Sequence, residues 1–156
     1  MNNNNKCFVK AIIFSFITIL FTSNLSANVK LNFMSLKNNE VYLRQGPSFE
    51  YPIKLIYKKK YLPVEILDKS APWRQIRDFN NNYGWIHISQ LSNRKSGINM
   101  NKNSIMYKKP TIYSKPLARL ELGRLVLIKK CELKWCKIKT GDYIGWINKS
   151  ALWGRI

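Results

Sequence analysis

The sequence has few of the residues from which catalytic and metal centres are usually built. Its 156 residues include one histidine, three cysteines and eight acidic residues. No Cys–His or Ser–His–Asp arrangement can be assembled around the single histidine, His87, from the sequence. A zinc site needs about four ligands, which one histidine and two nearby cysteines do not supply. The sequence therefore predicts no enzyme, no metal site and no other cofactor.

A helical pattern is also missing. No segment after residue 27 places apolar residues at helical spacing, whereas residues 62–67 and 73–79 alternate apolar and polar side chains. Polar turns such as residues 80–82 separate these runs. Glu65 and Asp78, the acids considered as a catalytic pair, lie on predicted strands beside basic residues, and we interpret them as surface charges. The expected fold class is all-β.

The N-terminus has the pattern of a secretory signal peptide. Lys6 and Lys10 precede an uncharged apolar run over residues 11–21, and small and polar residues follow to Ala27. The run is shorter than the roughly 20 residues that span a membrane. We predict a signal peptide over residues 1–27 and an exported protein, periplasmic or secreted, that meets the membrane only through this segment before cleavage. An uncleaved membrane anchor is the alternative.

The charge is strongly one-sided. The sequence has 27 Lys and Arg against 8 Asp and Glu, a formal net charge of +19. Residues 28–92 hold ten bases and five acids (+5), and residues 93–156 hold fifteen bases and three acids (+12). Such a field favours anionic partners: peptidoglycan carboxylates, lipid phosphates or acidic proteins. A generally basic proteome explains the net charge equally well, and lysines beside strands also discourage aggregation.

Two of the cysteines are close together in the sequence. Cys131 and Cys136 flank a predicted tight turn between neighbouring strands. An exported setting favours a disulfide between them. The enclosed loop is short, so the expected stabilisation is modest.

An internal repeat organises the rest of the chain. Gly84-Trp85-Ile86 and Gly145-Trp146-Ile147 each follow a Trp-x-x-Ile strand and precede a Ser-x-Leu ending. Such self-similarity predicts a tandem of two small all-β units. Units of this length have little core of their own, so we expect them to pack together.

Both repeats resemble bacterial SH3-like domains, in particular exported two-repeat proteins of proteobacteria. The resemblance rests on Leu43-Arg44-Gln45-Gly46-Pro47, Leu62-Pro63-Val64-Glu65, Gly84-Trp85-Ile86 and the terminal Leu152-Trp153-Gly154. It implies two tandem SH3-like barrels, with repeat 1 at residues 38–92, a linker at 93–103 and repeat 2 at 104–156. Two departures stand out. Tyr61 replaces the glycine that this family usually has before Leu-Pro-Val-Glu, and repeat 2 lacks the Arg-x-Gly-Pro loop.

Aromatic residues supply both the expected core and the candidate binding residues. Burial statistics place four tryptophans in the core: Trp73, Trp85, Trp135 and Trp146. The candidates for an aromatic groove are Tyr42, Tyr51, Tyr57 and Tyr113, with Arg44 available to an anion. Each of these five residues also fits a packed or solvated role.

The resemblance implies a non-catalytic binding or scaffolding protein of the cell envelope that recognises peptidoglycan or a wall-associated protein. The alternative is an interaction module for an acidic envelope protein or host protein. A basic nucleic-acid-binding barrel is a third reading. The signal segment argues against it, so no nucleic-acid partner is expected.

Overall fold

The structure, a computed structural model, describes residues 32–156 and consists there of short antiparallel strands and two turns of 3₁₀ helix. The predicted signal peptide, residues 1–27, lies outside the described residues. The elements of repeat 1 are β1 (Asn32–Leu36), β2 (Val41–Arg44), β3 (Ile53–Tyr57), β4 (Pro63–Ser70), β5 (Trp73–Arg77), β6 (Tyr83–His87), η1 (Ile88–Gln90) and β7 (Leu91–Ser92). Those of repeat 2 are β8 (Ser96–Asn99), β9 (Ser104–Tyr107), β10 (Pro116–Leu120), β11 (Leu125–Glu132), β12 (Trp135–Thr140), β13 (Tyr143–Asn148), η2 (Lys149–Ala151) and β14 (Leu152–Gly154).

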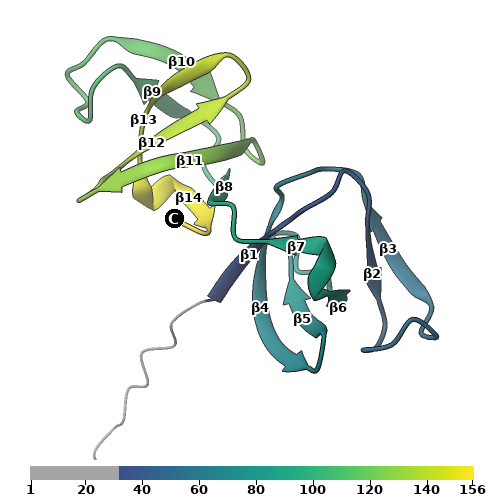
Figure 1. Cartoon of the computed structure of the whole chain (residues 1–156). Helices are drawn as coiled ribbons and strands as arrows, with labels where there is room; N and C mark the ends of the chain where they lie inside the picture. The colour runs from purple at the N-terminus through teal and green to yellow at the C-terminus, as the bar shows by residue number, and fades with distance from the viewer. Residues whose placement is uncertain (1–31) are drawn as a thin grey trace, which may run out of the picture. The chain divides into compact units, whose positions relative to one another are not determined.

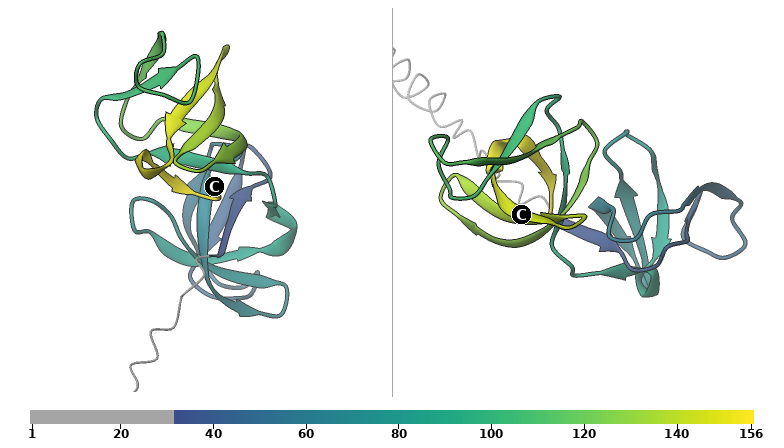
Figure 2. Two further views of the ribbon diagram at one scale, coloured as in Figure 1. Left: turned by 90° about the vertical axis from the view of Figure 1, so that its left-hand side faces the viewer. Right: turned by 90° about the horizontal axis from the view of Figure 1, so that it is seen from above.

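The strands form two sheets with the same topology. One sheet has the order β3-β2-β6-β5-β4-β1-β7, and the other has the order β10-β9-β13-β12-β11-β8-β14. Each strand of repeat 1 therefore has a counterpart seven strands later, and each sheet curls into a small barrel (Figure 1; Figure 2). These sheets confirm the predicted all-β class and the tandem of two small units.

Strand register aligns the two repeats residue by residue. Arg44 of β2 lies opposite Trp85 of β6, and Tyr107 of β9 lies opposite Trp146 of β13. Tyr107 is therefore the counterpart of Arg44. This alignment allows the same position to be compared in both barrels.

The Gly-Trp-Ile motif owes its glycine to close packing inside the barrel. Gly84 and Ile86 are buried, and a Cβ added at Gly84 would lie 2.6 Å from the Arg44 carbonyl oxygen on β2. Because strand side chains alternate, Trp85 between them points outward and is only half-buried. The structure thus corrects the expectation that Trp85 belongs to the core. Trp146, at the same outward position of repeat 2, is 8% exposed.

The two repeats share part of one apolar core. The core of repeat 1 contains Ile98 of β8, with Leu125 and Trp153 packed against it. The Trp153 ring meets the Phe33 ring edge-on at a centroid distance of 5.0 Å. The expected packing of the two units is therefore present, and it uses residues at both ends of the second repeat. The remaining core of repeat 2 gathers Met106, Leu120, Val126, Ile128, Cys136, Ile138, Ile147, Ala151 and Leu152.

The strand boundaries differ from the expected domain boundaries. Residues 96–99, within the expected linker 93–103, form β8, which pairs with both β11 and β14. All four residues of β8 are buried, although the segment reads as polar, because strands flank it on two sides. At the other end, β1 begins at Asn32, before the expected start at residue 38, and inserts between β4 and β7.

Glu65 and Asp78 are not surface charges: their exposed fractions are 4% and 2%. Glu65 accepts a hydrogen bond from Arg77 Nε at 2.7 Å across the β4–β5 pair, and this carboxylate raises the pKa of Arg77. Asp78 accepts bonds from the backbone N–H groups of Asn80 and Asn82 at 2.9 and 2.8 Å. An acidic side chain can be buried when hydrogen bonds or an ion pair satisfy its carboxylate. The sequence does not show which groups would pair with these two carboxylates.

Asp78 also accepts a hydrogen bond from the Tyr57 hydroxyl at 3.0 Å. Tyr57 is 7% exposed, and its burial together with the neighbouring carboxylate raises its pKa far above the usual range. This placement differs from the expectation that Tyr57 lines an exposed groove. Its hydroxyl instead joins β3 to the β5–β6 turn.

The predicted disulfide is present. Cys131 and Cys136 lie directly opposite each other on β11 and β12, with a Cα–Cα distance of 4.0 Å and a bonded pair of sulfur atoms. The Cys136 side chain faces the core of repeat 2. The bond closes the hairpin immediately before its tip.

Replacing Cys131 by serine is expected to lower the melting temperature under oxidising conditions only. The closed loop is short, so the loss should be below the roughly 3 kcal/mol of a 15-residue loop. Thermal unfolding with and without reductant measures the effect. An equal loss in both conditions would mean that the cysteine acts through packing and not through the bond.

Among residues 32–156, we find no helix whose length and apolar character would let it cross a bilayer.

Candidate functional site

The same corner of each barrel holds a tryptophan at the start of one strand and a polar residue at the end of the next. Trp73 lies opposite His87 in repeat 1, and Trp135 lies opposite Asn148 in repeat 2. The loop between the second and third strands of each repeat (β2–β3, residues 45–52, or β9–β10, residues 108–115) lies beside this corner.

In repeat 1 Phe49 lies over this corner: Phe49 itself is 63% exposed, but Trp73 beneath it is only 5% exposed. The Phe49 ring centroid lies 4.9 Å from that of Trp73 and 5.5 Å from that of His87. The Trp73 and His87 rings are themselves 5.3 Å apart. Three rings at these distances pack favourably, so the loop covers its own site.

Arg44 holds the covering loop in place. Its Nη1 atom donates hydrogen bonds to the carbonyl oxygens of Phe49 and Tyr51, at 3.0 and 2.7 Å, and its guanidinium lies 5.6 Å from the Phe49 ring. The Tyr51 ring packs over Gly46, where an added Cβ would lie 2.6 Å from the ring. Arg44 and Tyr51 therefore lie close together, and both stabilise the loop.

The other predicted groove residues lie elsewhere. Tyr42 donates its hydroxyl to Glu40, and bonds from Lys58 and then Tyr42 lower the pKa of that carboxyl. Tyr113 is 92% exposed in the loop of repeat 2. Together with the buried Tyr57, these positions do not form one groove.

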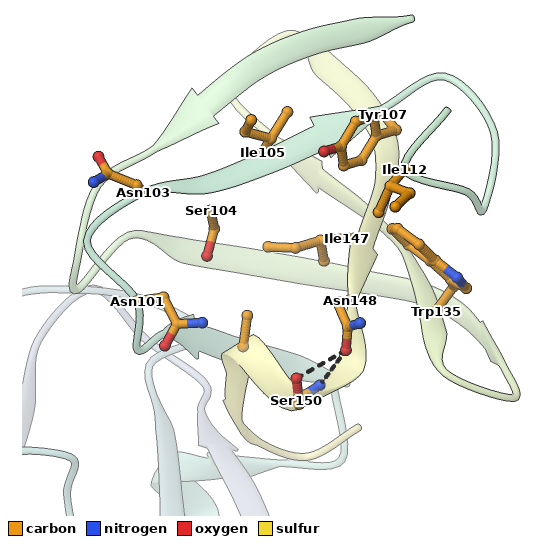
Figure 3. A pocket seen from close by; sticks show the side chains of 11 residues that line it. Asn101, Asn103, Ser104, Ile105, Tyr107, Ile112, Trp135, Ile147, Asn148 and Ser150 are labelled. Carbon is orange, nitrogen blue, oxygen red and sulfur yellow. Dashed lines mark hydrogen bonds between the residues drawn. The ribbon is translucent and has the colours of Figure 1, made fainter. Parts of the chain in front are cut away.

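In repeat 2 the corresponding corner is open. A pocket of about 310 Å³ occupies it, and Ile112 of the loop lies beside Trp135 at its edge (Figure 3). The Tyr107 ring meets the Trp135 ring edge-on at 5.8 Å. The pocket is lined by Asn101, Asn103, Ser104, Ile105, Tyr107, Ile112, Trp135, Ile147, Asn148, Ser150 and Ala151. Trp135 is half-buried and lines this pocket, which corrects its assignment to the core.

The polar wall of the pocket is preorganised. Asn148 Oδ1 accepts hydrogen bonds from the backbone N–H and the hydroxyl of Ser150, at 3.0 and 2.9 Å, and so caps η2. This fixes the side chain and leaves the amide nitrogen without a hydrogen bond to any other described residue. His87 caps η1 in the same way, with Nδ1 2.7 Å from the Ser89 hydroxyl.

A buried asparagine shapes the pocket floor. Asn99 Nδ2 donates to the carbonyl oxygens of Asn101 and Glu121 at 2.7 and 2.8 Å, and its Oδ1 accepts from the Ser104 hydroxyl at 2.6 Å. These bonds fix residues 99–104, which carry two of the lining asparagines. Tyr107, Ile112 and Asn148 line the pocket but were not predicted as site residues. The available signal was the change from His87 to Asn148 between the repeats.

The chemical groups of the pocket are aromatic faces, aliphatic side chains and neutral amides and hydroxyls. Such a set stacks against flat or apolar ligand faces and exchanges hydrogen bonds with amides and hydroxyls. In the described part of the chain, no three His, Cys, Asp or Glu side chains cluster as a metal ion would require.

Comparisons with known proteins identify the repeats. The sequence profile of the family described as "Bacterial SH3 domain" matches residues 37–93 and again residues 101–154. A search of curated proteins found no match.

Solved structures show only a distant likeness. NlpC2 from Trichomonas vaginalis is 18% identical with a TM-score of 0.36, and the match covers 79% of this chain and 48% of that one. NlpC1 from the same organism is 18% identical with a TM-score of 0.36, over 81% of this chain and 47% of that one. An NlpC/P60 family protein from Bacillus cereus ATCC 10987 is 11% identical with a TM-score of 0.35, over 78% and 55%. The chain spans about half the length of these proteins.

The family match covers more than half of the sequence, falls on both repeats and agrees with the two equivalent sheets. The chain belongs to the bacterial SH3 domain family.

Proposed function

We propose that this chain is an exported, non-catalytic binding protein of the cell envelope that recognises peptidoglycan or a wall-associated protein through the pocket of repeat 2. The observation that carries the proposal is the contrast between the two repeats. In repeat 1 Phe49 stacks over Trp73 and leaves it 5% exposed, whereas in repeat 2 Trp135 is half-buried and lines a pocket together with Asn148. Its volume of about 310 Å³ lies at the lower end of the range for ligand sites.

The pocket chemistry matches peptidoglycan, which offers amides, hydroxyls and apolar sugar faces. Tyr107 and Trp135 provide aromatic faces, and the amide of Asn148 provides hydrogen-bond donors. Peptidoglycan also carries carboxylates, which the positive charge of residues 93–156 attracts. Affinity would thus have a salt-resistant part from the pocket and a salt-sensitive part from the lysines.

The arrangement of the titratable groups favours a binding role over catalysis. His87 is committed to capping η1, and the buried Glu65 and Asp78 are held by Arg77 and by the β5–β6 turn. A catalytic site would need a nucleophile or general acid with a base in hydrogen-bond reach of a substrate. The described residues around the pocket offer amides, hydroxyls and aromatic rings instead.

Replacing Trp135 by alanine is expected to weaken binding to purified peptidoglycan sacculi by about tenfold or more, because half-buried aromatic anchors dominate such contacts. Cosedimentation of the protein from Asn28 to Ile156 with sacculi, at low and high salt, measures this. Trp85→Ala is the matched control, because Trp85 is also a half-buried, outward-facing tryptophan but lies on repeat 1. Equal binding by Trp135→Ala and the wild type would contradict the role of the pocket.

An acidic envelope protein or host protein is the second candidate. The net charge of +12 over residues 93–156 favours it. Saturable binding to one protein, with no salt-resistant binding to sacculi, would select this candidate.

A further inference from the structure

The tip of the β11–β12 hairpin carries side chains that do not line the pocket. Beyond the disulfide, Glu132 pairs with Trp135, and Leu133 and Lys134 form the two-residue tip (Figure 1). Leu133 is 97% exposed and adopts a φ of 47°. Leucine is rare at positive φ, where asparagine and glycine are usual in such turns. The fold therefore holds an apolar side chain in water at a position that a polar residue would suit better.

The hairpin is also strongly basic. Residues 129–139 hold five lysines and one acid, a net charge of +4, whereas the equivalent residues 67–77 of repeat 1 hold three bases and one acid, or +2. The single acid, Glu132, is paired with Lys130 at 2.5 Å. Lys130 also lies directly opposite Lys137 across the two strands. Like charges at that position repel, and Glu132 offsets only one of the two lysines.

A buried tryptophan lies beneath these lysines. Lys137 is the register partner of Trp146, and the Lys130 ammonium lies 5.4 Å from the Trp146 ring. The Lys130 ammonium over the ring is a cation–π contact. Trp146 is only 8% exposed, so this part of the hairpin presents the charge of the lysines and not the tryptophan.

The same tip in repeat 1 lacks these features. Its turn is formed by Ala71 and Pro72, with Ala71 at a φ of 47°, the same value as Leu133. The backbone is shared, but the large apolar side chain and the disulfide occur only in repeat 2. The two hairpin tips therefore differ in their side chains and not in their backbone conformation.

We propose that the β11–β12 tip is a docking surface for the anionic phosphate headgroups of a phospholipid bilayer. Leu133 would enter the headgroup region, the lysines of residues 129–139 would meet the phosphates, and the disulfide would hold the tip in shape. A protruding apolar residue surrounded by positive charge suits a soft anionic surface, since no groove surrounds Leu133 to hold a peptide. This site adjoins the pocket at Trp135 but uses other side chains, and it does not depend on the proposed peptidoglycan binding.

The test is cosedimentation with vesicles of phosphatidylcholine containing about a quarter phosphatidylglycerol, and with vesicles of phosphatidylcholine alone. The protein from Asn28 to Ile156 is used, because the strands and both cores lie in the compact unit Leu31–Ile156 and the predicted signal segment would itself bind lipid. Binding is expected with the anionic vesicles only. Leu133→Ser is expected to weaken it about tenfold, from the loss of one buried leucine. Lys130→Gln with Lys137→Gln is expected to weaken it by a similar factor.

Two matched controls test whether the tip is responsible. Leu122→Ser removes another exposed leucine of repeat 2, and Lys108→Gln with Lys109→Gln removes two lysines from a different loop. Both controls are expected to bind like the wild type. The proposal fails if anionic vesicles do not bind, if Leu133→Ser leaves binding unchanged, or if the control lysine variant loses as much as the hairpin variant. It also fails if soluble polyglutamate binds with the same dependence on Leu133, which would indicate an acidic protein partner.

Discussion

Gly84→Ala is expected to destabilise the protein by about 3 kcal/mol, the upper end of the usual range for overpacking a core. The added Cβ would lie 2.6 Å from the Arg44 carbonyl oxygen and 2.7 Å from Leu43 Cγ, so backbone as well as side chain must move. The two strands in contact, β2 and β6, are the pair that brings the covering loop to the Trp73 corner. Thermal unfolding should show a fall of about 10 °C in the melting temperature.

Gly145→Ala should have a comparable effect, because its Cβ would lie 2.7 Å from the Tyr107 carbonyl oxygen. Gly141→Ala is the matched control. Nothing lies within 4 Å of a Cβ at Gly141, and only its φ of 54° opposes the substitution. Left-handed backbone costs a non-glycine residue about 1 kcal/mol. Equal losses in all three variants would show that backbone conformation, and not close strand packing, explains the Gly-Trp-Ile motif.

Asp78→Ala is expected to lower the free energy of unfolding by about 3–5 kcal/mol, the range for breaking a buried charged network. The carboxylate accepts bonds from the backbone N–H groups of Asn80 and Asn82, from the Asn82 side chain at 2.8 Å and from the Tyr57 hydroxyl. Alanine would leave the buried hydroxyl of Tyr57 unpaired and the turn without its cap.

Urea or thermal unfolding of Asp78→Ala measures the loss, with Asp142→Ala as the control. Asp142 belongs to the equivalent turn of repeat 2 but is exposed, so its removal should change stability by less than about 0.5 kcal/mol. A loss below about 1 kcal/mol for Asp78→Ala would mean that water replaces the network at little energetic expense.

The repeat, the strands and the disulfide could be predicted because each is visible as a short sequence pattern. Gly-Trp-Ile recurs in both units, and the two cysteines flank a two-residue turn. The orientation of Trp85 could not be predicted in the same way. Alternation shows that Gly84 and Ile86 share a face, but the contact with β2 decides that this face points inward.

Long-range pairing explains what the sequence did not reveal. β8 reads as a polar linker, and only its pairing with β11 and β14 buries it. Glu65 and Asp78 read as surface charges, because their partners come from other strands or from backbone N–H groups. The pocket of repeat 2 depends on which residue its loop places beside the tryptophan. Phe49 lies beside Trp73 in repeat 1, whereas the smaller Ile112 lies beside Trp135 in repeat 2.

The binding role of that pocket can be tested by following the indole N–H signals of the five tryptophans in a nuclear magnetic resonance titration with soluble peptidoglycan fragments. We predict that the Trp135 indole and the backbone amides of Tyr107 and Asn148 shift saturably, also at high salt. The Trp73 signal, under Phe49, should stay in place. Shifts confined to residues 129–134 that disappear with salt, or no shifts at all, would contradict recognition through the pocket.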